Sequence, residues 1–199
     1  MPSERGAGNV SWKILQGNIK KGSINIHLID KEFDTGDIVA RKKISYSNKG
    51  KAVLPEDILK ITAKNEKLFL KFFLNRMIKN KKNKKIKQKH SDSYYWPRLN
   101  SDTDGRINWS WDAKDIISFV RAFSKPYNGA FTFIGKSKIS IFNAEIYSTN
   151  KKFHPYQNGI VFRKDKKHIY VSNHKGSIKI KIKDVQFTKN TKFLGKRFR

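Results

Sequence analysis

The sequence lacks cysteine altogether, has few acidic residues and contains no long apolar run. Without cysteine, the chain cannot form disulfides, thiolate metal sites or a cysteine nucleophile. No apolar run approaches the roughly 18 residues that span a bilayer, and the N-terminus has no signal-peptide core. These absences predict a cytoplasmic protein without a membrane helix.

Acidic residues are scarce relative to basic ones: 16 Asp and Glu stand against 44 Lys and Arg, a formal net charge of +28 over 199 residues. Hydrophobic residues still make up 37% and aromatic residues 13%, which predicts a packed core rather than a disordered polycation. The excess is spread along the chain, since residues 116–199 alone carry 19 basic and three acidic residues. Two interpretations stay open: a surface that binds phosphates, or a codon bias toward lysine, asparagine and isoleucine.

The first 80 residues alternate between helix and strand patterns. A short helix is expected at 10–15, a half-buried strand at 23–29 and an extended segment at 38–44. A long helix with a broad apolar stripe is expected from Pro55 to about Met77. Proline suits the start of a helix, and the apolar residues that follow recur every three or four positions.

A polar, lysine-rich segment at 79–93 predicts a linker, with a domain boundary between about residues 80 and 108. The run from Lys79 to Lys89 is either solvated or a nucleic-acid contact. The aromatic residues that follow either stack on bases or anchor the linker on the protein: Tyr94, Tyr95 and Trp96.

The second half of the chain begins with one helix and continues as strands. Asp112 or Ser110 is expected to cap a helix that ends before Pro126. Short strands are expected at 131–134, 139–142, 160–162, 169–171 and 178–182. Several short strands separated by turns predict a small barrel.

The candidate site residues are few. The five histidines show no spacing typical of a metal site: His27, His90, His154, His168 and His174. The most specific local feature is Asp34-Thr35-Gly36-Asp37, between two expected strands. From the residues alone it is either an Asx-type turn or a loop that holds one carboxylate toward a site.

An ordered set of motifs carries a family resemblance. Arg5-Gly6-Ala7 precedes a short helix with Trp12, and a strand with His27 leads into Asp34-Thr35-Gly36-Asp37-Ile38. Three further motifs follow: Asp104-Gly105-Arg106-Ile107-Asn108-Trp109-Ser110, Arg121-Ala122-Phe123 and Pro126-Tyr127-Asn128-Gly129-Ala130-Phe131. Together they resemble the 10-formyltetrahydrofolate-dependent formyltransferases, the family of methionyl-tRNA formyltransferase and the amino-sugar N-formyltransferases.

The resemblance implies 10-formyltetrahydrofolate as the formyl donor and a primary amine as the acceptor. By position, Asp34 corresponds to the family's catalytic aspartate, which assists removal of the amine proton. An upstream Asn-x-His pair of the family polarises the formyl carbonyl. Gly36 and Asp37 correspond to the loop beside the folate, and Arg5 is assigned to substrate binding.

For the fold, the resemblance implies an α/β arrangement, the second half of a Rossmann-like formyltransferase domain at 1–80. A basic linker at 81–107 and a small OB-like β-barrel domain at 108–199 are expected to follow. The chain begins just after the position of the family's Asn-x-His pair. We therefore expect a truncated chain that is inactive alone, with a separate N-terminal half-domain as one partner.

The amine acceptor stays open between an amino-sugar nucleotide and methionyl-tRNA. The stretch from Pro97-Arg98-Leu99 to Asp104-Gly105 is similar to the sugar-modifying members, whereas the positive charge suits an RNA acceptor. A different class of function is also open: a non-catalytic, basic RNA-binding module derived from methionyl-tRNA formyltransferase.

Overall fold

The structure is a computed structural model that describes residues 5, 9–17, 19–46, 52–81, 83–147, 151–187 and 191–199. Gly6 and Ala7, which stand beside Arg5 in the first family motif, lie outside the described residues. The chain divides into two compact units, Met1–Arg98 and Leu99–Arg199. Within the described ranges, no helix combines the length and apolar character needed to cross a membrane.

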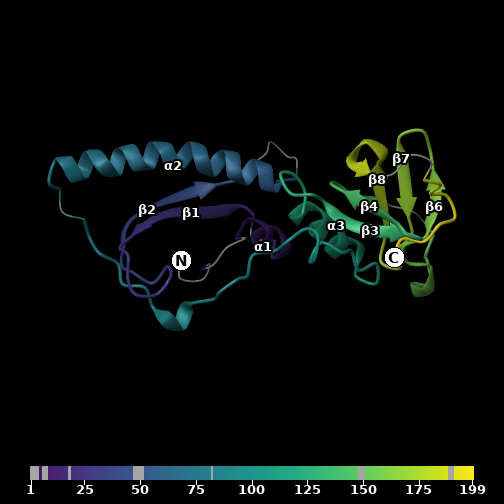
Figure 1. The fold of residues 1–199 in the computed structure, drawn as a ribbon, viewed down its shortest axis with the longest axis horizontal. Helices are drawn as coiled ribbons and strands as arrows, with labels where there is room; N and C mark the ends of the chain where they lie inside the picture. Colours follow the sequence, from purple (N-terminus) through teal and green to yellow (C-terminus); the bar gives the residue numbers. More distant parts are fainter. Residues whose placement is uncertain are drawn as a thin grey trace. The chain divides into compact units, whose positions relative to one another are not determined.

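The first unit is built on an antiparallel hairpin. Its elements are α1 (Asn9–Leu15), β1 (Lys21–His27), β2 (Ile38–Ser45), α2 (Pro55–Ile78) and the short turn η1 (His90–Asp92). β1 pairs with β2, and α2 runs along the hairpin, packing against β2 and α1 (Figure 1). The two helices and two strands expected in the first 80 residues are thus confirmed, with β1 ending two residues earlier than predicted.

The start of α2 follows from its sequence. Pro55 occupies the first turn, and the Asp57 carboxylate accepts a hydrogen bond from the backbone N–H of Leu54 at 3.0 Å. This contact satisfies one of the donors that a helix start leaves without an intrahelical partner.

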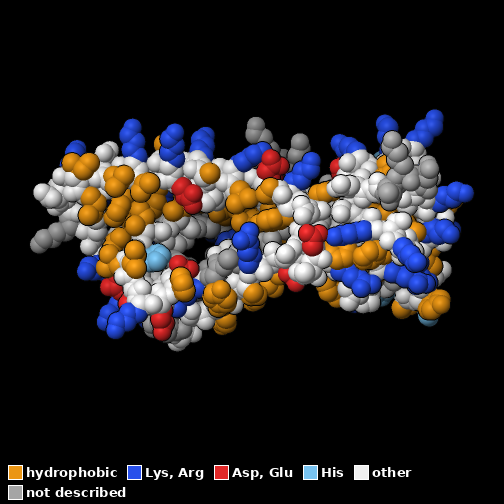
Figure 2. Space-filling view, viewed as in Figure 1, with side chains coloured by type: hydrophobic (Ala, Val, Ile, Leu, Met, Phe, Trp, Pro, Cys, Tyr) orange, Lys and Arg blue, Asp and Glu red, His pale blue; other side chains and the backbone are white. Residues whose placement is uncertain are grey.

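The apolar stripe of α2 is wider than the face that packs. Ile58 and Phe69 are buried, whereas Leu68 and Phe72 are 57% and 58% exposed. Figure 2 shows apolar side chains gathered at the surface of this unit. The helix thus presents an apolar face to the surface in addition to the one it buries.

Residues 83–98 return to the hairpin. Ile38 and Ile86 exchange backbone hydrogen bonds at 3.0 and 2.9 Å, forming an isolated antiparallel bridge at the start of β2. The division between the units, after Arg98, falls inside the segment 81–107 for which a linker is predicted. The first part of that segment therefore belongs to the packed first unit.

Aromatic residues tie the end of the first unit to α1. The rings of Trp12 and Trp96 lie 4.9 Å apart, and the Trp12 indole N–H donates to the carbonyl of Pro97 at 2.8 Å. Tyr94 and Tyr95, by contrast, are 62% and 71% exposed. Trp96 therefore anchors this segment, while the two tyrosines leave most of their surface uncovered.

The second unit consists of α3 (Ala113–Ala122) and two antiparallel sheets. The first sheet has the order β3-β4-β9: β3 (Ala130–Ile134), β4 (Ser137–Ile141) and β9 (Val185–Gln186). The second has the order β5-β8-β7-β6: β5 (Glu145–Tyr147), β6 (Val161–Lys164), β7 (His168–Val171) and β8 (Ser177–Lys181). Two short turns, η2 (Pro155–Gln157) and η3 (Ile182–Asp184), complete the unit.

No sheet of the described strands closes into a barrel, so the expected OB-like barrel is not confirmed. The C-terminal segment instead contacts an edge of each sheet. Phe133 and Arg199 exchange backbone hydrogen bonds at 2.9 and 3.0 Å, while Ile160 and Arg197 form an isolated bridge beside β6. The two sheets are therefore linked through the C-terminal segment rather than through a continuous ladder.

β8 shows how the strand alternation builds this unit. Ile178 and Ile180 are buried, while Lys179 and Lys181 lie on the opposite face and pair with Glu145 of β5 at 3.1 and 3.4 Å. The structure thus confirms the strand that the two-residue period predicts, with one apolar and one charged face.

Candidate functional site

β1 ends at His27, where the register of the hairpin is irregular. The register shifts between Ile26 and His27, so that β2 contributes one extra residue, Val39. Bulges of this kind re-aim side chains and are common beside functional sites. Nδ1 of His27 lies 2.8 Å from the carbonyl oxygen of Leu28, an acceptor, which assigns the proton of the neutral ring to Nδ1. Nε2 of the neutral ring is then an acceptor.

Asp34 lies next to this ring. Its Oδ1 is 3.6 Å from Nε2 of His27, and the two side chains are 38% and 24% exposed, respectively. The backbone of Asp34 is left-handed, with φ 59°, a conformation that aspartate adopts more readily than most residues other than glycine. The two side chains thus face each other at a separation just beyond hydrogen-bond distance.

Gly36 brings the loop against the end of β1. A Cβ at this position would lie 2.0 Å from the carbonyl oxygen of Leu28, a backbone atom that cannot move aside cheaply. Next to it, the Leu28 N–H donates to the carbonyl of Asp37 at 2.9 Å. The glycine is therefore required because two backbones meet here, and its φ is not left-handed.

Gln88, which lies in the segment 83–98, supports the loop that carries Asp34. The sequence did not single out this residue as a candidate. Its Nε2 donates to the carbonyl oxygens of Asp34 and Gly36 at 3.0 and 2.7 Å. Its Oε1 accepts from Nη2 of Arg5 at 3.5 Å, and Gln88 and Arg5 are only 9% and 7% exposed. The available signal was the alternation of Ile86 and Gln88 with lysines over residues 84–89, a two-residue period typical of a strand.

The first unit thus brings the four candidate residues into one neighbourhood. Arg5 reaches the loop through Gln88, Asp34 and Gly36 share the Gln88 amide, and Asp37 contributes its backbone carbonyl. Nε of Arg5 is buried and has no hydrogen-bond partner among the described atoms. The arrangement places a partly exposed carboxylate and imidazole beside a loop that Gln88 supports.

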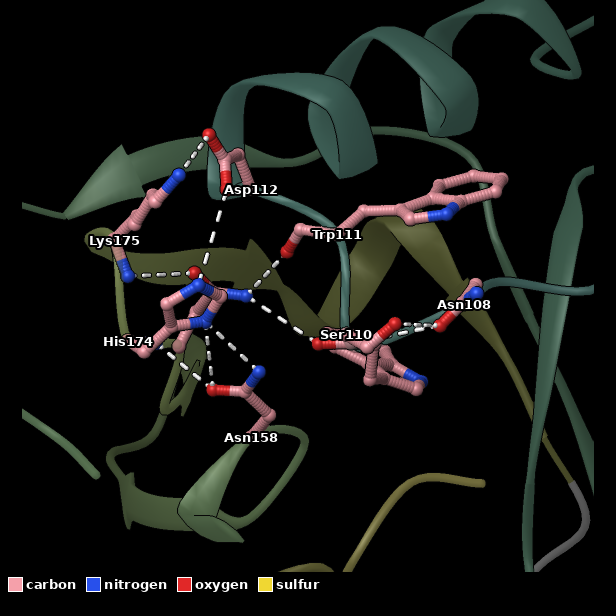
Figure 3. Close-up of polar contacts among 9 residues, drawn as sticks. Asn108, Ser110, Trp111, Asp112, Asn158, His174 and Lys175 are labelled. Carbon is pink, nitrogen blue, oxygen red and sulfur yellow. Dashed lines mark hydrogen bonds and ion pairs between the residues drawn. The ribbon is translucent and has the colours of Figure 1, made fainter. Parts of the chain in front are cut away.

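A second polar cluster lies in the second unit, at the start of α3 (Figure 3). Asp112 occupies the N-cap position, which confirms one of the two predicted cap residues, but its side chain makes no capping hydrogen bond. The carboxylate is instead 3.2 Å from Nζ of Lys175 and 3.9 Å from Nε2 of His174. The carboxylate thus pairs with Lys175 rather than with the helix N–H groups.

Residues 100–198 match the family described as formyl transferase, C-terminal domain. The second unit is therefore a domain of that kind, and the chain belongs to the formyltransferase family.

Solved structures with the same fold include three formyltransferases. An N-formyltransferase from Helicobacter canadensis, in complex with folinic acid and dTDP-3-aminofucose, is 22% identical with a TM-score of 0.63; the match covers 94% of this chain and 63% of that one. WlaRD, a sugar 3N-formyl transferase in the presence of dTDP and 5-N-formyl-THF, is 20% identical with a TM-score of 0.64, covering 96% and 63%. Methionyl-tRNA formyltransferase from Clostridium thermocellum is 20% identical with a TM-score of 0.54, covering 74% and 60%.

The present chain spans less than two thirds of each of these three proteins. At this identity the likeness shows the shared fold. Two of the three were solved with folate derivatives, and one of them also with an amino-sugar nucleotide.

Proposed function

We propose that this chain is part of a formyltransferase that passes a formyl group from 10-formyltetrahydrofolate to a primary amine. The observation that carries the proposal is the His27–Asp34 pair, 3.6 Å apart and partly exposed at the end of a bulged hairpin. Membership of the formyltransferase family supports the same reaction class.

In the proposed reaction, the amine nitrogen bonds to the formyl carbon, and the bond from that carbon to N10 of the folate breaks. Asp34 accepts the amine proton, which passes to the leaving nitrogen. His27 flanks the carboxylate, with its Nε2 3.6 Å from Oδ1 of Asp34. The groups that polarise the formyl carbonyl would be the Asn-x-His pair of the family, supplied from outside the described residues.

We assign the remaining candidates by their neighbourhood. Gly36 and Asp37 would face the folate, since they form the backbone that adjoins the Asp34 carboxylate. Arg5 would contact the substrate, as the family resemblance implies.

For the acceptor, we favour an amino-sugar nucleotide over methionyl-tRNA. The stretch from Pro97 to Gly105 is similar to the sugar-modifying members, and two sugar-modifying relatives match nearly the whole chain. The tRNA acceptor is the second candidate because of the positive charge.

We further propose that an N-terminal half-domain covers the first unit and completes the site, and that the 199-residue chain alone does not transfer formyl groups. The exposed apolar side chains support such a partner; they include Leu28, Phe33, Leu68, Phe72 and Met77.

The test is a formylation assay with 10-formyltetrahydrofolate and either a dTDP-amino sugar or methionyl-tRNA. The chain is assayed alone and coexpressed with a polypeptide that supplies the upstream half of the catalytic domain. We expect transfer only in the coexpressed sample and at least about 10²-fold slower transfer with Asp34→Asn. Asp30→Asn, which removes an exposed carboxylate from the same loop, is the matched control and should leave the rate unchanged.

The outcomes separate the parts of the proposal. Equal transfer by the chain alone would contradict the need for a partner but not the reaction class. Wild-type rates in Asp34→Asn would contradict the assigned role of Asp34.

A non-catalytic RNA-binding module is the alternative function. It rests on the charge of the second unit, where residues 99–199 carry 21 basic and seven acidic residues. Without transfer in any sample, RNA binding that weakens steeply with added salt would favour this alternative.

A further inference from the structure

The second unit carries a hollow that is separate from the Asp34 loop. Its volume is about 630 Å³, within the range of small-molecule sites. Three segments line it: residues 106–110, the η2 region with Asn158, and the C-terminal residues 197–199. All three belong to the second unit, so the hollow exists independently of the proposed formyl-transfer site.

In two of these segments, successive side chains point alternately into the core and toward the hollow. Ile107 and Trp109 are buried while Arg106 is exposed, and Phe198 is buried next to exposed Arg199. The Trp109 and Phe198 rings lie 5.1 Å apart beneath the surface. The extended backbone therefore places an aromatic floor on one side and basic side chains on the other.

The lining carries three arginines and no acidic residue: Arg106, Arg197 and Arg199. None of them forms an ion pair with a carboxylate in the described part of the chain. The guanidinium of Arg197 donates to the carbonyls of Tyr156 and Asn158 at 2.6 and 3.3 Å, contacts that orient it without neutralising its charge. Guanidinium groups bind phosphate through paired hydrogen bonds, so this hollow is suited to a phosphate group.

An aromatic surface adjoins the arginines. The Arg197 guanidinium lies over the Tyr156 ring, 4.8 Å from its centroid, and Tyr156 is 78% exposed. Exposed aromatic rings and guanidinium planes are the groups on which nucleobases stack. The hollow thus combines phosphate-binding and base-stacking groups.

The rim is held in place by the polar cluster of Figure 3. Nδ2 of Asn173 donates to the carbonyl of Trp111 at 2.8 Å, and Oδ1 of Asn158 accepts from the backbone N–H of His174 at 2.9 Å. The side chain of Ser110 donates to Oδ1 of Asn108 at 2.6 Å. A site whose backbone is fixed in this way loses little entropy on binding a ligand.

We propose that this hollow binds a nucleoside di- or triphosphate. Arg106 and Arg199 hold the phosphates, and the base stacks on Tyr156 beside Arg197. A free nucleotide fits better than an RNA strand because the three arginines line a single hollow of small-molecule size.

The test is calorimetric titration of the full 199-residue chain with ADP, adenosine, inorganic tripolyphosphate and a short single-stranded RNA. We expect saturable binding of ADP and none of adenosine. Arg106→Gln should weaken the binding of both ADP and tripolyphosphate about tenfold, since a hydrogen bond to a charged group is lost. Tyr156→Ala should weaken the binding of ADP about tenfold and leave the binding of tripolyphosphate unchanged.

The matched control is Arg163→Gln. Arg163 also lies over a tyrosine ring, 4.9 Å from the centroid of Tyr170, but it does not line the hollow. The proposal would be overturned if the chain did not bind ADP, or if neither Arg106→Gln nor Tyr156→Ala weakened ADP binding. It would also be overturned if Arg163→Gln weakened ADP binding as much as they do. Strongly salt-dependent RNA binding that is lost in Arg106→Gln, with ADP binding far weaker, would overturn it in favour of a nucleic-acid surface.

Discussion

The side-chain amide of Gln88 donates to the backbone carbonyl of Gly36 at 2.7 Å, and the same nitrogen donates to the carbonyl of Asp34 at 3.0 Å. One buried side chain, 52 residues away in sequence, thus satisfies two acceptors of the loop that carries the candidate carboxylate. The conformation of the loop therefore depends on residues 83–98 packing on the hairpin.

Replacing Gln88 with leucine should loosen this loop. Two carbonyls would lose their donor, and we expect the first unit to lose about 1–2 kcal/mol of stability. Hydrogen exchange of the Leu28 amide, which donates to Asp37, should become faster. Lys87→Ala, an exposed neighbour in the same segment, is the control, and equal exchange rates in the two variants would contradict the role of Gln88.

Gly36→Ala tests the close approach of the loop to β1. The new methyl group would lie 2.0 Å from the Leu28 carbonyl oxygen, so the loop has to shift, at a cost of about 3 kcal/mol. Gly17→Ala provides the comparison, since Gly17 has φ 71° and open space around it, and strain alone should cost about 1 kcal/mol. Urea unfolding followed by tryptophan fluorescence, to which Trp12 and Trp96 of the first unit contribute, measures both, and a smaller loss for Gly36→Ala would refute the steric argument.

The hairpin and the helices were predictable because their signals are local. Alternating residues in 23–29 and the proline start of α2 act within a few positions, and the structure confirms both elements. The burial of Gln88 was not predictable in the same way, because it depends on a contact with a loop far away in sequence. A polar side chain within a lysine run is typical of a solvated segment. Only the alternation of Ile86 and Gln88 with lysines indicates a strand instead.

Whether the sheets close into a barrel could not be predicted from the sequence either. The alternation of Ile178 and Ile180 predicts a strand with one buried face, but it does not say which edges pair. β5 and β9 are three and two residues long, too short for a readable period, and they are the strands at the ends of the two sheets. The prediction of a barrel therefore rested on the number of short strands and on the family resemblance, neither of which says which strand edges pair.

Thr132→Val tests the floor of the second unit. Oγ1 of the fully buried Thr132 accepts from the Trp109 indole N–H at 2.9 Å and donates to the Arg199 carbonyl at 2.9 Å. Valine keeps the shape but leaves a buried indole donor unsatisfied, so we expect a loss of about 1–3 kcal/mol. The exposed Thr103→Val should be nearly neutral in the same unfolding experiment.

A double mutant identifies the cause. In the Thr132→Val background, Trp109→Phe removes a donor that already has no acceptor, so it should cost less than in the wild type. Equal costs in the two backgrounds would show that the hydrogen bond contributes nothing.

Because of Asp165, the stability of the second unit depends on pH in the acidic range. The backbone N–H groups of Lys167 and His168 each donate to its Oδ1 at 2.7 Å, and the Tyr170 hydroxyl donates to Oδ2 at 2.9 Å. These bonds, that from Lys167 foremost, lower the pKa of Asp165 from 3.8 to about 2. The carboxylate therefore stabilises the fold fully above its unfolded pKa of 3.8, and this contribution is lost as the pH falls toward 2.

Asp165→Asn removes that contribution at neutral pH. We expect a lower Tm than the wild type at pH 7, and a difference between the two proteins that shrinks as the pH is lowered through the window between 3.8 and 2. Asp115→Asn, an exposed carboxylate of the same unit, is the control for the general effect of lost negative charge in a strongly basic chain. Thermal unfolding followed by circular dichroism at a series of pH values gives the comparison. A wild-type-minus-variant difference that stays constant down to pH 2 would mean that the hydrogen bonds of Asp165 do not lower its pKa in the folded chain.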